Sequence, residues 1–287
     1  MINKISNRHI AVIIVSMKTV LVVFIILQLT LFTEKEIDVS FDEQFLLLVF
    51  AGFIAQLIDG ALGMAYGVSC TTFLLNFGVP PVLASASVHT AEVFTTGVSG
   101  LSHLFLKNVN LKLFLRLAIP GVIGSVTGAY LLSNVLDGGF IKPYVSAYLF
   151  LIGVFILVKS FKVLNQKREV KKVSALGLAG GFFDSIGGGG WGPIVTSNLI
   201  MQGETPRETV GTVNTAEFFV TFFSTGVFLF FVGVDSWKII LALIIGGVIA
   251  APFGALMAKK INPKLLMLFV GIVIIITSSY TIYKSLS

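Results

Sequence analysis

The sequence predicts an all-α polytopic membrane protein made of two inverted repeats, each a re-entrant helical hairpin plus three transmembrane helices, with one extra N-terminal helix. Three observations predict this fold class. The 287-residue chain is 55% hydrophobic and only 12% charged, whereas soluble domains carry about 25% charged residues. Apolar runs long enough to cross a bilayer recur along the chain. Two of its segments also repeat one another around a glycine-rich break.

The first apolar run, 10–32, follows Lys4 and Arg8. We interpret it as a retained helix, which with the acidic loop after it makes up residues 1–44. A cleaved signal peptide is the alternative, but no small-residue cleavage site follows the run. The other apolar runs are 45–58, 81–105, 113–132, 143–158, 206–232, 239–258 and 265–283. None alternates apolar and polar residues as the strands of a membrane barrel do.

An internal duplication organises the rest of the chain. Residues 52–96 align without a gap with residues 177–221, at a constant offset of 125 (184 minus 59). The match includes "TAE" at 90–92 and 215–217, and it resumes after one inserted residue, where 121–129 is similar to 247–255. We therefore expect, within one membrane domain, repeat 1 at 45–158, a basic linker at 159–172 and repeat 2 at 173–287.

The basic residues predict the orientation of each segment. Because cytoplasmic loops are enriched in Lys and Arg, the linker and the N-terminus are expected in the cytoplasm. Segment 45–76 then begins and ends outside, and segment 173–201 begins and ends inside. Each is therefore expected to be a re-entrant pair of half-helices, with bends at "IDGALG" (58–63) and "DSIGGGG" (184–190). Three further crossings per repeat give the two repeats opposite orientations.

Inverted repeats with broken helices are typical of secondary transporters. A helix break at membrane depth is tolerated where it lines a cavity or a site, although glycines can also serve close helix packing. Half-helices that start at the midplane direct their N–H groups and positive dipole ends at the break, which favours an anion. The expected substrate-binding residues surround the breaks: Gly63, Tyr66, Gly67, Ser69, Cys70, Thr71, Gly188, Gly189, Gly190, Trp191, Thr196, Ser197 and Asn198.

Six further polar residues are expected in or near the site, in coupling or structural roles: Asp59, His89, Glu92, Asp184, Asn214 and Glu217. The two aspartates lie at the bends and can cap the second half-helix. The glutamates follow in "HTAE" and "NTAE". His89 lies one turn before Glu92 on the same face, and such a pair can carry protons or connect the hairpin to the next helix. Because Asn214 replaces His89 in repeat 2, either a proton path is asymmetric or His89 is not part of it.

Two motifs carry a family resemblance. "GVPPVLASASVHTAEVFTT" (78–96) and "GGGGWGPIVTSNLI" (187–200) resemble the TauE/SafE family of membrane permeases, over residues 45–285. The first break, "GALGMAYG", has fewer glycines than the family's usual run, and Val68 stands where repeat 2 has Pro193. The resemblance implies transport, in several members export, of a small sulfur-containing anion such as sulfite, thiosulfate or an organosulfonate across the cytoplasmic (inner) membrane.

Taken together, these features predict a multi-pass secondary transporter that works by alternating access and ion-gradient coupling. A passive anion or solute channel is the alternative. No nucleophile motif or metal cluster supports an enzyme, and no Walker loop supports ATP hydrolysis. Cys70 is the only cysteine, which excludes disulfides within the chain. No catalytic residue, metal, cofactor or nucleic acid is expected. The expected partners are the anion, protons or another coupling ion and the lipid bilayer, with a homodimer left open.

Overall fold

A computed structural model describes residues 6–31, 41–161, 172–234, 236–257 and 263–286. Its elements are helices and the breaks between them. The bounds are α1 Asn7–Leu31, α2 Glu43–Leu62, α3 Tyr66–Asn76, α4 Pro81–Phe105, α5 Leu111–Tyr130, η2 Leu131–Val135, α6 Gly138–Ser160, α7 Val173–Gly187, η3 Gly192–Thr196, α8 Ser197–Met201, α9 Pro206–Phe231, α10 Trp237–Met257 and α11 Pro263–Leu286.

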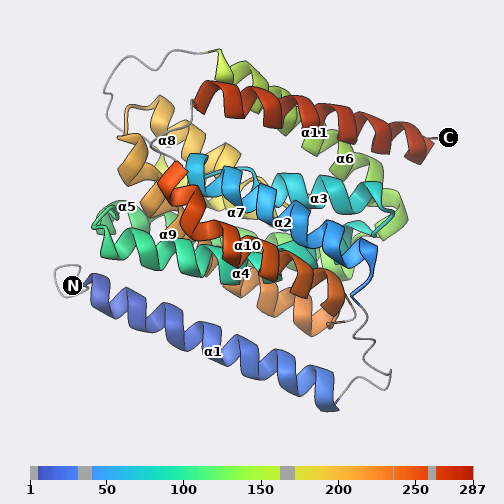
Figure 1. Ribbon diagram of the computed structural model, residues 1–287, viewed down its shortest axis with the longest axis horizontal. Helices are drawn as coiled ribbons and strands as arrows, with labels where there is room; N and C mark the ends of the chain where they lie inside the picture. Colours follow the sequence, from blue (N-terminus) through green and yellow to red (C-terminus); the bar gives the residue numbers. More distant parts are fainter. Residues whose placement is uncertain (1–5, 32–40, 162–171, 235, 258–262, 287) are drawn as a thin grey trace.

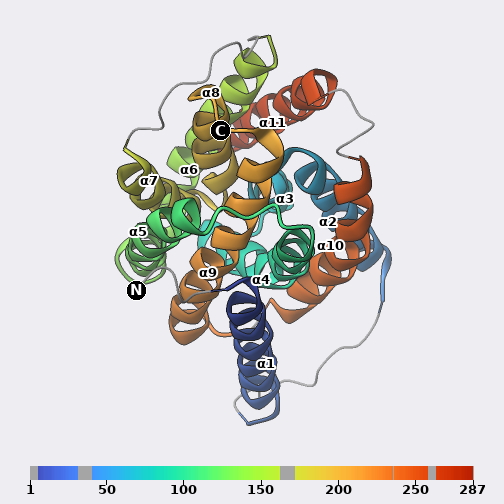
Figure 2. The ribbon, with the colours of Figure 1, turned by 90° about the vertical axis from the view of Figure 1, so that its left-hand side faces the viewer.

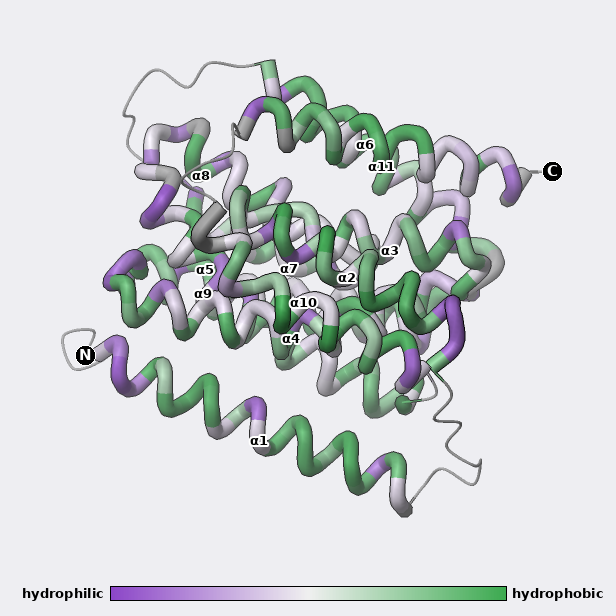
Figure 3. The backbone as a smooth tube through the Cα atoms, viewed as in Figure 1, coloured by the Kyte–Doolittle hydropathy of each residue, from purple (hydrophilic) through white to green (hydrophobic). Residues whose placement is uncertain are grey.

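The helices identify a multi-pass membrane protein. Seven of them are long and apolar enough to cross a membrane, and the described residues contain no strand. This confirms the predicted all-α polytopic class. In Figure 1 the long helices run roughly side by side along the horizontal axis, with α1 at one edge and α6 and α11 at the opposite edge. Figure 3 shows largely apolar helices with hydrophilic residues gathered toward their ends.

The two broken segments each turn back on themselves. The start of α2 lies beside the end of α3, since Gln44 and Leu48 share a small surface pocket with Phe73 and Phe77. In the second segment, a Cβ added at Gly180 would meet Val195 and Trp191, which follow the break. Each segment is therefore an antiparallel hairpin. In Figure 2, α7 lies beside α5 on the left and α2 lies beside α10 on the right.

The first arm of the α2–α3 hairpin is longer than the half-helix that the sequence predicts. Helix α2 has 20 residues, and a helix of that length spans about 30 Å. Its counterpart α7 has 15 residues. Helix α2 is long because Asp42 caps its start, where its side chain accepts a hydrogen bond from the Phe45 N–H at 2.8 Å, and because the helix continues until Gly63. Apolar run 45–58 is thus only the central part of α2.

Close helix contacts recur at the offset of the sequence duplication. Helix α2 packs against α10, and α7 packs against α5. A Cβ at Gly52 would lie 3.0 Å from the Leu243 carbonyl oxygen, and one at Gly177 would lie 2.7 Å from the Leu117 carbonyl oxygen. The two glycines lie 125 positions apart in the sequence, and the two leucines lie 126 positions apart. Glycine permits such close backbone approach, so each hairpin's first arm is held by a helix of the other predicted repeat.

Helix α1 lies outside this arrangement and packs on α4. One face contributes the buried residues Ile10, Ile14 and Leu21, and the rest is largely exposed. Lys18 lies within the helix, with its Nζ 3.4 Å from the Phe94 carbonyl oxygen. A Cβ at Gly97 would lie 2.8 Å from the Lys18 Cδ. The lysine is therefore accommodated by a glycine on α4 within the apolar span.

The glycine contacts lead to a stability prediction. In Gly246→Ala the new Cβ would lie 2.7 Å from the Phe53 backbone nitrogen, so α2 and α10 must separate. We expect a loss of about 1–3 kcal/mol in stability. The control is Gly226→Ala on α9, where nothing lies within 4 Å of an added Cβ; it should be neutral or slightly stabilising. Thermal unfolding can be followed by dye labelling of the buried Cys70. Equal melting temperatures for Gly246→Ala and Gly226→Ala would contradict the packing argument.

Candidate functional site

Two breaks in the helices form the centre of the candidate site. Helix α2 is followed by Gly63 at φ 67° and Ala65 at φ 96°. Helix α7 is followed by Gly188 at φ 69°, Gly189 at φ 153° and Gly190 at φ 155°. Positive φ angles favour glycine, so the glycine run of the second break has a direct backbone reason. Ala65 adopts such an angle at the position equivalent to Gly190, where an L side chain is strained.

The two breaks contact each other. The Thr196 hydroxyl donates to the Gly63 carbonyl oxygen at 2.8 Å, and the Thr71 hydroxyl donates to the Gly188 carbonyl oxygen. A Cβ at Gly67 would lie only 2.9 Å from the Gly189 Cα. The two hydrogen bonds are equivalent under the 125-residue offset. They connect each hairpin to the carbonyl group at the break of the other, and such helix-end carbonyls need a partner.

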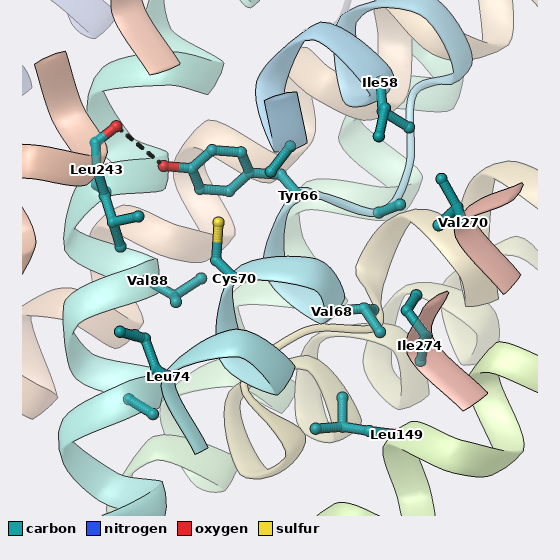
Figure 4. Close-up of a cluster of buried hydrophobic side chains, with 14 of the residues drawn as sticks. Ile58, Tyr66, Val68, Cys70, Leu74, Val88, Leu149, Leu243, Val270 and Ile274 are labelled. Atoms are coloured by element: carbon teal, nitrogen blue, oxygen red, sulfur yellow. Dashed lines mark hydrogen bonds between the residues drawn. The ribbon is translucent and has the colours of Figure 1, made fainter. Parts of the chain in front are cut away.

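The other residues expected to bind substrate are placed around these contacts. The Tyr66 hydroxyl donates to the Leu243 carbonyl oxygen at 3.3 Å, with Cys70 beside it in an apolar cluster (Figure 4). Buried Trp191 donates through Nε1 to the Val213 carbonyl oxygen at 3.3 Å. Ser69 is half-buried. Ser197 contacts the Met64 sulfur at 3.9 Å, and Asn198 donates to the Ile194 carbonyl oxygen at 2.6 Å.

One residue at the second break was not predicted from the sequence. Tyr148, on α6, donates through its hydroxyl to the Gly189 carbonyl oxygen at 3.1 Å. A Cβ at Gly187 or Gly190 would collide with its ring or hydroxyl. Tyr148 lies outside the duplicated blocks that drew attention to the breaks, so no pattern in the sequence pointed to it.

Both aspartates cap the half-helix that follows the break. The Trp191 backbone N–H donates to Asp184 Oδ1 at 2.8 Å, and the Tyr66 backbone N–H interacts with the Asp59 carboxylate. These pairs are again equivalent under the offset. Capping, the structural role considered for these residues, is therefore what the contacts show. At the start of each half-helix, one backbone N–H group thus already has a carboxylate as its partner.

His89 joins the Asp184 carboxylate across the two predicted repeats. Its Nε2 lies 3.1 Å from Asp184 Oδ2, and both side chains are buried. Its Nδ1 lies 2.8 Å from the Ser85 carbonyl oxygen, which can only accept, so Nδ1 carries a proton. The contact between Nε2 and Oδ2 then needs one further proton, on either atom. The His89–Asp184 contact is therefore a hydrogen bond when a proton lies on Nε2 or on Oδ2.

Asn214, at the position equivalent to His89, does not repeat this contact. Its side-chain amide donates to the Ser99 hydroxyl at 3.0 Å. The structure thus has the asymmetry that the sequence suggests, with an imidazole on one side and an amide directed elsewhere on the other.

The glutamates complete a buried cluster of four carboxylates. Glu92 on α4 and Glu217 on α9 are 2% and 5% exposed. The Gly67 backbone N–H interacts with the Glu92 carboxylate. One oxygen of each glutamate, Oε2, has no hydrogen-bond partner among the described residues. Together with Asp59 and Asp184 the glutamates lie close enough to repel one another electrostatically. Unpaired charge at such depth is costly, so the cluster favours a bound cation or protons.

Two carboxylates of the cluster and the neighbouring His89 could together hold a metal ion. The donor atoms of His89, Glu92 and Asp184 lie within 4.8 Å of one another. An imidazole nitrogen and two carboxylates also suit a proton that moves among them. The arrangement can therefore bind a positively charged species beside the two breaks.

The contacts between the breaks predict a loss of stability when either hydroxyl is removed. Thr71→Val and Thr196→Val keep the shape of the side chain but leave a buried carbonyl without its donor, and each should destabilise the fold by about 1–3 kcal/mol. Thr127→Val is the control, since that hydroxyl is exposed and bonds to the Ile123 carbonyl oxygen within its own helix. If all three variants had the melting temperature of the wild type, the two reciprocal hydrogen bonds would not be what holds the hairpins together.

Comparison with known proteins identifies the family of the chain. The family model for sulfite exporter TauE/SafE matches residues 48–281. The chain is 42% identical over 250 residues to the "Probable membrane transporter protein YtnM" of Bacillus subtilis (strain 168), covering 84% of this chain and 83% of that protein. It is 22% identical over 239 residues to the "Probable membrane transporter protein MJ0441" of Methanocaldococcus jannaschii, covering 76% and 88%. No solved structure matches. The chain belongs to the TauE/SafE family of membrane transporters.

Proposed function

We propose that the protein is a secondary transporter that moves a small sulfur-containing oxyanion across the cytoplasmic membrane. The observation that carries the proposal is the meeting of two helix breaks, each with its own caps, at one buried polar centre of a multi-pass protein. Broken helices that converge in this way are typical of secondary transporters. The family description names sulfite, and thiosulfate and organosulfonates are proposed substrates of the same chemical class.

Alternating access follows from a motion of one repeat against the other. The equivalent contacts of Gly52 with Leu243 and of Gly177 with Leu117 support two related halves. Because each hairpin also bonds to the other through Thr71 and Thr196, a rocking motion would exchange or break these bonds. Opening toward one side at a time is the expected result.

The carboxylate cluster is the proposed site of coupling to an ion gradient. It combines a histidine–aspartate pair that can share a proton with two buried carboxylate oxygens that have no hydrogen-bond partner among the described residues. A proton or another cation bound there would offset the repulsion among the four carboxylates. Movement of the cation with the anion would then link transport to the cation's gradient.

Flux measurements test the function directly. Proteoliposomes containing the wild-type protein should take up radiolabelled sulfite or thiosulfate saturably, and an imposed pH gradient should change the rate. Glu217→Gln removes one carboxylate of the cluster, so it should reduce the gradient response by about tenfold or more. Glu208→Gln, near the start of α9 and outside the cluster, should behave as the wild type.

Other results of the flux measurements would each contradict a different part of the proposal. Gradient-coupled flux that Glu217→Gln leaves unchanged would make this glutamate structural. Flux that does not saturate would favour a passive channel. Absence of flux for both anions, in protein shown to be folded, would overturn the substrate class.

The predicted orientation can be tested with single cysteines. After Cys70→Ser removes the only cysteine, Lys107→Cys in the α4–α5 connection should face the cytoplasm and Val135→Cys at the end of η2 should face outward. Both side chains are exposed. A membrane-impermeant maleimide should label Val135→Cys in intact cells, and Lys107→Cys only after permeabilisation. The reverse pattern would invert the assigned topology.

A further inference from the structure

We propose that Glu92 occupies, as a substitute anion, the place at the start of α3 where the transported oxyanion binds, so that the anion enters by displacing the Glu92 side chain. This inference rests on the proposed function and names the residue with which the substrate competes. Glu92 thus competes with the transported anion for the N–H groups at the start of α3.

The start of α3 is an anion site filled by the protein's own carboxylates. The first hydrogen bond inside the helix runs from the Ser69 N–H to the Ala65 carbonyl oxygen at 3.0 Å. The N–H groups that precede Ser69 therefore have no partner within the helix. Tyr66 directs its N–H to Asp59, and Gly67 directs its N–H to Glu92. Free N–H groups at a helix start, with the positive end of the helix dipole, bind oxyanions.

Glu92 is the carboxylate that can leave this place. Asp59 belongs to the same hairpin as Tyr66 and lies in the last turn of α2, so it moves with the break. Glu92 comes from α4 on a longer side chain, and its buried Oε2 has no hydrogen-bond partner in the part of the chain that the structure describes. Repulsion from the neighbouring carboxylates further weakens its hold. A shift of the hairpin against α4 would separate Glu92 from Gly67.

The space that the anion needs is the space that Glu92 fills. A Cβ at Gly67 would lie 2.9 Å from Glu92 Oε1 and 2.9 Å from the Gly189 Cα. The carboxylate oxygen thus lies directly over a residue that has no side chain, against the second break. An oxyanion that replaced it could accept from the Gly67 N–H while in contact with both breaks.

Equilibrium binding tests the competition. Isothermal titration calorimetry of the full-length protein in detergent would compare the wild type, Glu92→Gln, Glu92→Ala and Glu217→Gln with sulfite, thiosulfate, methanesulfonate and phosphate as probes. Glu92→Gln removes the negative charge, so a sulfur oxyanion should bind about tenfold more tightly or better. Glu92→Ala also vacates the Gly67 N–H and should bind at least as tightly as Glu92→Gln. Glu217→Gln should give a smaller gain, since only its longer-range repulsion is lost.

The outcomes separate this inference from the proposed function. Binding to the wild type that both Glu92 variants leave unchanged or weaken would overturn the competition and keep the transporter. Tighter binding of phosphate alone by the Glu92 variants would support the competition and overturn the sulfur substrate. Failure of every protein to bind any of the four anions, with Cys70 still protected from dye in the folded state, would overturn both. An equal gain from Glu217→Gln would reduce the effect of Glu92 to charge alone and overturn direct displacement.

Discussion

The rest of the structure depends on one constraint: the backbone groups freed by two helix breaks must find partners where no water is available. The chain meets this demand with carboxylates at the helix starts and hydroxyls at the helix ends. Asp184 accepts from the Trp191 N–H, and Thr71 and Thr196 donate to the carbonyl groups of the opposite break. Because the hydroxyls act across the two hairpins, neither break is satisfied without the other.

Those parts of the fold that follow from local chemistry could be predicted from the sequence. The long apolar helices, the breaks at Gly63 and Gly188 and the capping aspartates all rest on nearby residues. The bonds between the breaks could not be predicted, because they join residues 117 and 133 positions apart. Tyr148 was missed for the same reason, since α6 reaches the second break only in three dimensions. Ala65 shows a further limit, because this buried residue adopts a positive φ angle at which glycine would be expected.

The repeat in the sequence also conceals a difference in chemistry. The two capping aspartates are equivalent, yet only Asp184 contacts a histidine. Asn214, which stands where His89 would be, turns to Ser99. Sequence alone revealed the substitution but gave no direction for either side chain. The contacts show that the imidazole serves the hairpin of the other repeat, so a proton held there belongs to the interface between the halves.

A centre rich in carboxylates is an unexpected place for an anion, and electrostatics limits how one could bind there. Four ionised carboxylates beside one imidazole would carry an excess of negative charge in a medium of low dielectric constant, where repulsion between like charges is strong. An oxyanion can reach the half-helix starts only if positive charge arrives with it or if a carboxylate departs. The structure offers both routes, because the His89–Asp184 pair can share a proton and Glu92 reaches the Gly67 N–H from α4, outside the hairpin. Coupling between the movements of the anion and the cation would then follow directly from charge balance at the helix breaks.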